Sequence, residues 1–105
     1  MNHKRQRKHV LVQVGSTPEG LTVWHGVYTF YETYGLPLSD LFSLMWERGG
    51  LPDWLQLIKD MAAAGRPFPR CVEAVCAAVG DACYPIETRD RVIARIQAME
   101  APANG

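Results

Sequence analysis

The segment Leu38-Ser-Asp-Leu-Phe-Ser-Leu-Met-Trp46 decides the fold class of this chain. Its apolar residues recur at spacings of three and four, as they do along the buried face of an α-helix. They are Leu38, Leu41, Phe42, Met45 and Trp46. Two glycines follow at 49–50, and glycine commonly ends a helix. The segment therefore predicts a core-facing helix over 38–48.

Two segments further along the chain repeat this combination of an apolar stripe with start and stop signals. The first, 52–64, begins at Pro52 and ends before Gly65, and proline is favoured in the first helical turn. The second, 69–82, follows a proline-rich connector. Their stripes are Trp54, Leu55, Ile58, Met61 and Ala62 in the first, and Val72, Val75, Val79 and Ala82 in the second. Similar stripes predict two more helices, at about 26–34 and 86–99.

The N-terminal part of the chain has a different period. Three valines alternate with other residues, at Val10, Val12 and Val14. This spacing is typical of a β-strand. Turn-forming residues fill 15–20, and β-favouring residues follow at 21–24. The pattern slightly favours a short hairpin. The alternative is a single strand followed by a helix that Thr17 caps, with Pro18 at its first position.

These elements together predict a mostly α protein. We expect a compact bundle of about five short helices, preceded by a short N-terminal β-strand or β-hairpin. A chain of 105 residues is the usual size of one domain. The expected organisation is a basic flexible tail at 1–8, a single mainly helical domain at 9–100 and a frayed C-terminus at 101–105.

Composition excludes several classes of protein. Hydrophobic residues make up 48% of the chain and charged residues 21%, which is ordinary for a globular domain. The apolar runs are far shorter than the roughly 20 residues that span a bilayer. The apolar segment behind the basic N-terminus, 9–14, is too short for a signal peptide, and no cleavage site follows it. We therefore expect a cytoplasmic protein.

The three cysteines do not form a recognisable metal or disulfide pattern. They stand at Cys71, Cys76 and Cys83, an odd number that does not fit a secreted disulfide framework. Their spacings also differ from the paired cysteines of zinc modules. We expect them to be buried small hydrophobes. No metal site and no cofactor are predicted.

The chain also lacks a catalytic constellation. Burial on an alanine-valine helix would make the cysteine thiols inert. Ser39-Asp40 is typical of a helix start, and Asp53 and Asp60 are expected at opposite ends of a solvated helix face. The glycine pair at 49–50 lacks the lysine and spacing of a phosphate-binding loop. We therefore expect a protein that is not an enzyme.

One segment loosely resembles the helix-turn-helix of DNA-binding proteins. Residues 27–46 would supply a helix, a turn at Gly35-Leu36 and a second helix, and the resemblance implies that the second helix enters the major groove. The sequence departs from that pattern at Tyr31, where a small residue is usual. The helix at 38–46 also lacks the lysine, arginine, asparagine or glutamine that reads base edges. A helical hairpin used for packing is the better interpretation.

A basic arm is the main electrostatic asymmetry of the chain. Four of the eleven cations lie within five residues, at Lys4, Arg5, Arg7 and Lys8. The remainder holds seven basic and eleven acidic side chains, a formal charge of −4. If the arm binds nucleic acid, these residues would contact phosphates without reading sequence. The simpler interpretation is a solubilising tail.

Aromatic residues are concentrated in one part of the chain. Eight of the ten lie between residues 24 and 54, and a domain of this size has little room to bury them all. Tyrosine and tryptophan are enriched in protein interfaces. The interface candidates are Trp24, Tyr28, Tyr31, Tyr34 and Trp46. An aromatic core with a few exposed rings is an equally good account.

The function that the sequence favours is non-catalytic macromolecular binding. We expect a small interaction or accessory protein that self-associates as a homodimer or binds another protein, without a membrane or small-molecule partner. The N-terminal strand supports this prediction, because a short strand can pair with its copy in another chain. The alternative is a nucleic-acid-binding accessory or regulatory protein that uses the basic arm.

Overall fold

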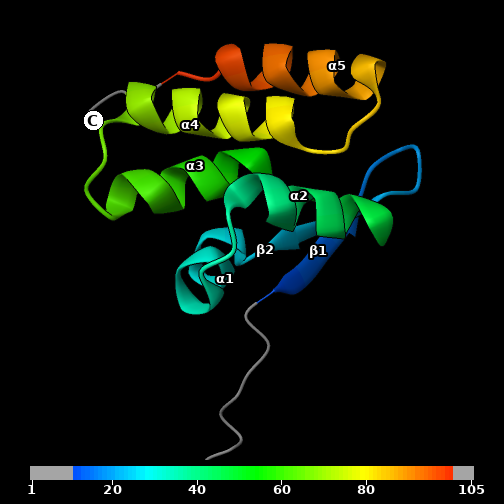
Figure 1. Cartoon of the computed structure of the whole chain (residues 1–105), viewed down its shortest axis with the longest axis horizontal. Helices are drawn as coiled ribbons and strands as arrows, with labels where there is room; N and C mark the ends of the chain where they lie inside the picture. The colour runs from blue at the N-terminus through cyan, green and yellow to red at the C-terminus, as the bar shows by residue number, and fades with distance from the viewer. Residues whose placement is uncertain (1–10, 101–105) are drawn as a thin grey trace, which may run out of the picture.

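The computed structural model describes residues 11–100, which form five helices and a three-stranded sheet. The strands are β1 (Val12–Ser16), β2 (Thr22–His25) and β3 (Gly50–Pro52). The helices are α1 (Val27–Tyr34), α2 (Leu38–Glu47), α3 (Trp54–Ala63), α4 (Phe68–Asp81) and α5 (Ile86–Gln97). In Figure 1, α4 and α5 lie side by side on one side of α3, while the hairpin and α1 lie on the other.

The mostly α fold class is confirmed, together with the β element that precedes the helices. The helices expected at 38–48, 52–64 and 69–82 differ from the observed ones by two residues or fewer at each end. The predicted tail at 1–8 and the predicted frayed end at 101–105 lie outside the described residues. Within the described range, no helix is long and apolar enough to cross a membrane.

The N-terminal strand folds back as a hairpin, which was the favoured alternative. β1 and β2 are antiparallel, with Val12 opposite His25 and Ser16 opposite Thr22. A bulge between Gln13 and Gly15 shifts the register. Thr17 organises the turn, because its backbone N–H donates to the Leu21 carbonyl and its hydroxyl accepts from the Leu21 N–H. Thr17 therefore closes a hairpin and caps no helix.

The sheet contains a third strand that no pattern in the sequence indicates. β3 runs parallel to β2, with Gly50 opposite Thr22 and Pro52 opposite Trp24. Pro52 was expected to open a helix, but it ends this strand, and α3 begins at Trp54. The backbone must pass close to the Trp24 ring here, since a Cβ at Gly50 would lie 2.7 Å from the indole Nε1. Glycine satisfies that close approach.

One expected helix cap is absent. Ser39-Asp40 is typical of a helix start, but Pro37 holds the N-cap position of α2 and no side chain caps the helix. The Ser39 carbonyl instead accepts a hydrogen bond from the Ser43 hydroxyl. Proline also precedes α4 and α5, at Pro67 and Pro85, each with an extended ψ. Three of the five helices thus begin directly after a proline whose fixed φ suits a helix entry.

The core lies where α3 packs between the sheet side of the molecule and the α4–α5 pair. Its most deeply buried side chains come from all five helices and from β3, and they are Val27, Phe42, Pro52, Leu57, Ile58, Met61, Cys71, Val75, Val79 and Ile96. On α3, Leu57 is buried in place of Leu55, which belongs to the expected stripe but is 41% exposed. The helical members of this set line the inward faces of their own helices. Burial of side chains of this size stabilises the fold by about 1.5–3 kcal/mol each.

Candidate interaction surface

Helix α1 presents two different sides to its surroundings. Tyr28 and Tyr31 stack with ring centroids 5.8 Å apart, and Phe30 and Tyr34 form a second pair at 4.5 Å. Tyr28 is buried, Tyr31 and Phe30 are half-buried, and Tyr34 is 60% exposed. The helical period therefore directs Tyr28 toward the core and Tyr34 toward solvent, with Phe30 and Tyr31 between them.

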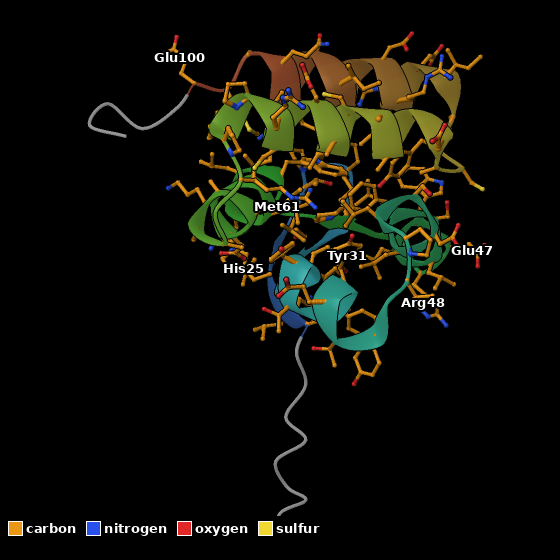
Figure 2. The ribbon with its side chains drawn as sticks, turned by 60° about the vertical axis from the view of Figure 1, so that its left-hand side comes forward. His25, Tyr31, Glu47, Arg48, Met61 and Glu100 are labelled. Carbon is orange, nitrogen blue, oxygen red and sulfur yellow. The ribbon has the colours of Figure 1, made fainter. Side chains whose placement is uncertain are left out.

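Tyr28 was an interface candidate, but the structure places it in the core, where α1 meets α3. A hydrogen bond to the Glu32 carboxylate raises the pKa of the Tyr28 hydroxyl. Figure 2 shows Tyr31 on α1, with Met61 of the buried core above it. Of the candidates on this helix, Tyr34 alone has most of its surface in contact with solvent.

The two tryptophan candidates lie in different surroundings. Trp24 is half-buried on β2, against Gly50 of the next strand. Trp46 is half-buried on α2 and meets Tyr84 edge to face at 5.3 Å. Tyr84 also contacts Trp54, which packs against Phe42 at 5.1 Å. Much of the aromatic content therefore builds a chain of edge-to-face contacts inside the protein.

Tyr84 is the one described residue whose buried polar atom has no hydrogen-bond partner. Its side chain is 7% exposed, and burial raises the pKa of its hydroxyl well above the ordinary value. An unpaired buried hydroxyl reduces stability, because it loses its hydrogen bonds to water without replacement.

Strand β1 is the most open element of the described structure. The order β1-β2-β3 gives it a neighbour on one edge only, and all five of its residues are exposed. Val12 is 51% exposed and Val14 is 46% exposed. A free strand edge offers unpaired backbone N–H and C=O groups, which can pair with another chain.

The structure also reveals a junction that the sequence did not indicate. His25 Nε2 lies 2.8 Å from Asp53 Oδ2, and the Asp53 Oδ1 accepts from the Gln56 N–H at 3.1 Å. The Asp53 N–H donates to the Trp24 carbonyl. Asp53 was expected on a solvated helix face, but it is half-buried and joins the end of β2 to the start of α3. A pair separated by 28 positions leaves no local pattern to detect.

The cysteines occupy three different environments. Cys71 is buried, Cys76 is intermediate and Cys83 is exposed, so the expectation of burial is wrong for Cys83, which lies beyond the end of α4. Desolvation raises the pKa of the Cys71 and Cys76 thiols. Between residues 11 and 100, no three His, Cys, Asp or Glu side chains are grouped closely enough to hold a metal ion.

Two arginines of α5, Arg91 and Arg95, border a hollow that the sequence analysis overlooked. Their spacing of four residues is common on solvated helices, so the sequence gave no reason to separate them from other surface charges. The basic-arm candidates Lys4, Arg5, Arg7 and Lys8 lie outside the described residues.

Comparisons of the chain with protein-family models, with curated proteins and with solved structures found no match in any of the three.

Proposed function

We propose that this chain is a non-catalytic interaction protein that self-associates through the free edge of β1, with the exposed Tyr34 of α1 as a supporting contact. The observation that carries the proposal is a strand that has no partner on one edge within residues 11–100 and whose five residues are all exposed. In this proposal, β1 of a second copy of the chain pairs with that edge.

The chemistry of β1 suits pairing with itself. Its sequence, Val-Gln-Val-Gly-Ser, contains no charged residue. Natural sheets commonly protect a free edge with charges, and two uncharged copies can approach without repulsion. The bulge between Gln13 and Gly15 interrupts the strand, so a pairing over this edge is short and needs side-chain contacts to support it.

Aromatic side chains of α1 can provide those contacts. Val12 pairs with His25, and α1 begins two residues after His25. The start of β1 is therefore close to the start of α1, and Tyr34 lies about 10 Å further along the helix axis. Tyr34 is 60% exposed, and tyrosine is a side chain that interfaces favour.

Sedimentation equilibrium of the full chain over a concentration series tests this proposal. We expect a dimer for the unmodified protein and a monomer for the double variant Val12→Lys, Val14→Lys, with circular dichroism unchanged. The matched control is Ile86→Lys, because Ile86 is 65% exposed at the start of α5, and this variant is expected to dimerise. A chain lacking residues 1–8 is also expected to dimerise.

Two results would contradict the proposal. One is a monomeric unmodified chain at every concentration, and the other is a double lysine variant that dimerises as well as the control. A dimer that is lost in the double variant and retained after removal of residues 1–8 supports β1 as the contact.

The second candidate function is nucleic-acid binding through the basic arm. The observation that favours it is the concentration of four cations in 4–8, ahead of a remainder with a formal charge of −4. Labelled duplex DNA and single-stranded RNA are titrated with the intact chain and with a chain lacking residues 1–8, at two salt concentrations. Binding that weakens steeply with salt and disappears without the arm supports this function. Absence of binding by the intact chain excludes it.

The raised pKa of the Cys71 and Cys76 thiols disfavours either of these two cysteines as a nucleophile, since a nucleophilic cysteine needs a lowered pKa. Fast alkylation of either thiol at neutral pH would contradict this part of the proposal.

A further inference from the structure

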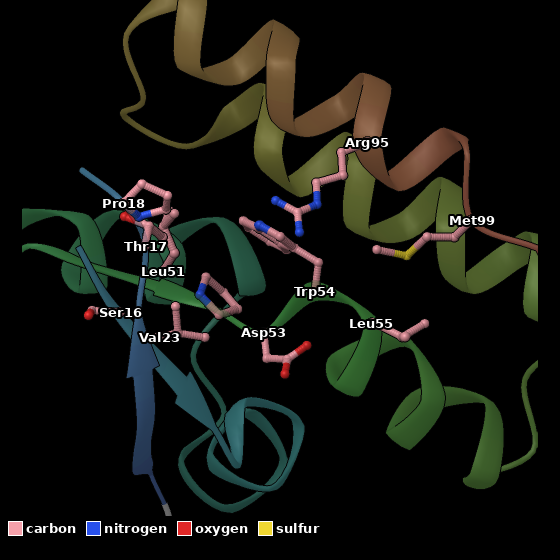
Figure 3. A pocket seen from close by; sticks show the side chains of 11 residues that line it. Ser16, Thr17, Pro18, Val23, Leu51, Asp53, Trp54, Leu55, Arg95 and Met99 are labelled. Carbon is pink, nitrogen blue, oxygen red and sulfur yellow. The ribbon is translucent and has the colours of Figure 1, made fainter. Parts of the chain in front are cut away.

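A groove runs along one side of α5, between that helix, the β1–β2 turn and the junction of β3 with α3. It consists of two adjoining hollows with volumes of about 320 and 450 Å³. Both hollows are lined by Thr17, Pro18, Leu51, Trp54 and Arg95. We call this feature the α5 groove. Figure 3 shows Arg95 reaching from α5 toward Trp54, with Thr17 and Pro18 on the opposite wall.

The groove combines an apolar floor with two guanidinium groups. Leu51 and Val92 are buried beneath it, and Trp54 is 6% exposed. Arg91 and Arg95 are exposed and lie one helical turn apart, so that both face the hollow. Within residues 11–100, neither arginine side chain forms a hydrogen bond or a salt bridge.

The carboxylates that border the groove already have partners. Asp53 accepts from the Gln56 N–H and bonds to His25. Glu19 has its pKa lowered by hydrogen bonds from its own backbone N–H and from the Thr17 hydroxyl, with a smaller contribution from Arg91. The carboxylates of Glu19 and Asp53 are therefore engaged by the β1–β2 turn and by the cap of α3. The guanidinium N–H groups of Arg91 and Arg95 have no hydrogen-bond partner within residues 11–100. An external carboxylate is the kind of group that two such guanidinium groups can recognise.

The length of the groove indicates an extended ligand. Its lining runs from Thr88 on α5 to Met99, two residues past the end of that helix, a distance of about 16 Å because the backbone stays helical through Ala98. An extended peptide covers that distance in about five residues. Single-stranded nucleic acid fits less well, because Trp54 is too deeply buried to stack on a base.

We propose that the α5 groove binds a short extended segment of another protein, in which an acidic side chain lies next to apolar ones. Arg91 and Arg95 hold the carboxylate, and Leu51, Val92 and the edge of Trp54 contact the apolar side chains. This site is separate from the proposed self-association, because Ser16 is the one residue of β1 that lines the groove.

Amide chemical-shift mapping of the ¹⁵N-labelled full chain tests the proposal with a defined probe. The probe is an acetylated and amidated pentapeptide of alternating leucine and glutamate, and the matched probe replaces glutamate with glutamine. We expect the glutamate peptide to shift the amides of Leu51, Trp54 and 88–95, and the glutamine peptide to bind at least about tenfold more weakly.

The variant that tests the arginines is Arg91→Gln, Arg95→Gln, for which we expect a loss of affinity of at least about tenfold. Its matched control is Arg66→Gln, Arg70→Gln, because these arginines are also exposed, four residues apart and beside a hollow at the start of α4. The control is expected to bind the glutamate peptide unchanged. Both variants replace exposed side chains, so the dispersion of their spectra should stay that of the unmodified protein.

Several outcomes would overturn the proposal. They are the absence of shifts confined to the groove at millimolar peptide, equal binding by the two arginine variants, and tighter binding of oligothymidylate or decanoate than of the glutamate peptide. Oligothymidylate would indicate a nucleic-acid site and decanoate a site for a small organic anion.

Discussion

At the scale of single residues, Gly50 determines whether β3 can join the sheet. A Cβ at this position would lie 2.7 Å from the Trp24 indole nitrogen and 3.3 Å from the Thr22 carbonyl. We expect Gly50→Ala to reduce the free energy of unfolding by about 1–3 kcal/mol, as other overpacked sites do. Urea denaturation followed by tryptophan fluorescence measures the change.

The control for Gly50→Ala is Gly80→Ala in α4, where an added Cβ meets nothing within 4 Å. Glycine is a poor helix former, so this variant should be more stable by about 0.5–1 kcal/mol. Equal effects of the two substitutions would show that the contact with Trp24 has no influence on stability.

Asp53 is the second residue whose individual chemistry matters. Its carboxylate caps α3 through the Gln56 N–H and contacts His25 at 2.8 Å. We expect Asp53→Ala to reduce the free energy of unfolding by about 1–2 kcal/mol, the usual cost of losing a cap. Asp53→Asn keeps one amide oxygen that can accept from the Gln56 N–H, while the second carboxylate oxygen, which meets His25, becomes a donating NH2 group. Because the cap is retained, this variant should cost less. Chemical denaturation of the three proteins at one pH checks this order, and an Asn variant as unstable as the Ala variant would contradict it.

At the scale of elements, α1 illustrates how one helix divides between core and surface. Tyr28 is 9% exposed and Tyr34 is 60% exposed, six positions later on the same helix. We expect Tyr28→Ala to reduce the free energy of unfolding by about 2–4 kcal/mol. Tyr34→Ala should change it by less than about 0.5 kcal/mol, while weakening the proposed dimer. Thermal unfolding measures the change in stability, and sedimentation measures the weakening of the dimer. A large loss of stability in Tyr34→Ala would contradict this division.

The elements also show how far the sequence could predict the fold. The helices were predictable because their stripes, prolines and glycines act over a few neighbouring positions. Gly35, for example, ends α1, and Pro37 directly precedes α2. β3 was not predictable, because its three residues are too few for a periodic pattern and its pairing partner lies more than 25 positions earlier. Of the interface candidates, Tyr34 and Tyr28 carry the same local signal, and packing against α3 distinguishes them.

At the scale of the whole molecule, Tyr84 connects elements that are distant in sequence. It follows α4 and contacts Trp46 of α2 and Trp54 of α3, while its buried hydroxyl lacks a partner within the described residues. We expect Tyr84→Phe to keep these ring contacts and raise the free energy of unfolding by about 1 kcal/mol. Tyr84→Ala should lower it by about 3–5 kcal/mol, as for other large aromatic truncations.

Differential scanning calorimetry of the unmodified protein and the two Tyr84 variants measures both effects. A Tyr84→Phe variant less stable than the unmodified protein would show that the hydroxyl has a partner, such as a bound water, and would contradict the prediction.

The sequence by itself determined the helical segments, the β-strand that precedes them and the concentration of positive charge at the N-terminus, because each depends on residues close together in the chain. Tertiary structure alone decided which aromatic residues are buried, that His25 meets Asp53, and that β3 joins the sheet. It also decided that Arg91 and Arg95 face Thr17 and Trp54 across the α5 groove. These features join segments far apart in the chain, and their positions depend on how whole helices pack, which no local pattern of residues encodes.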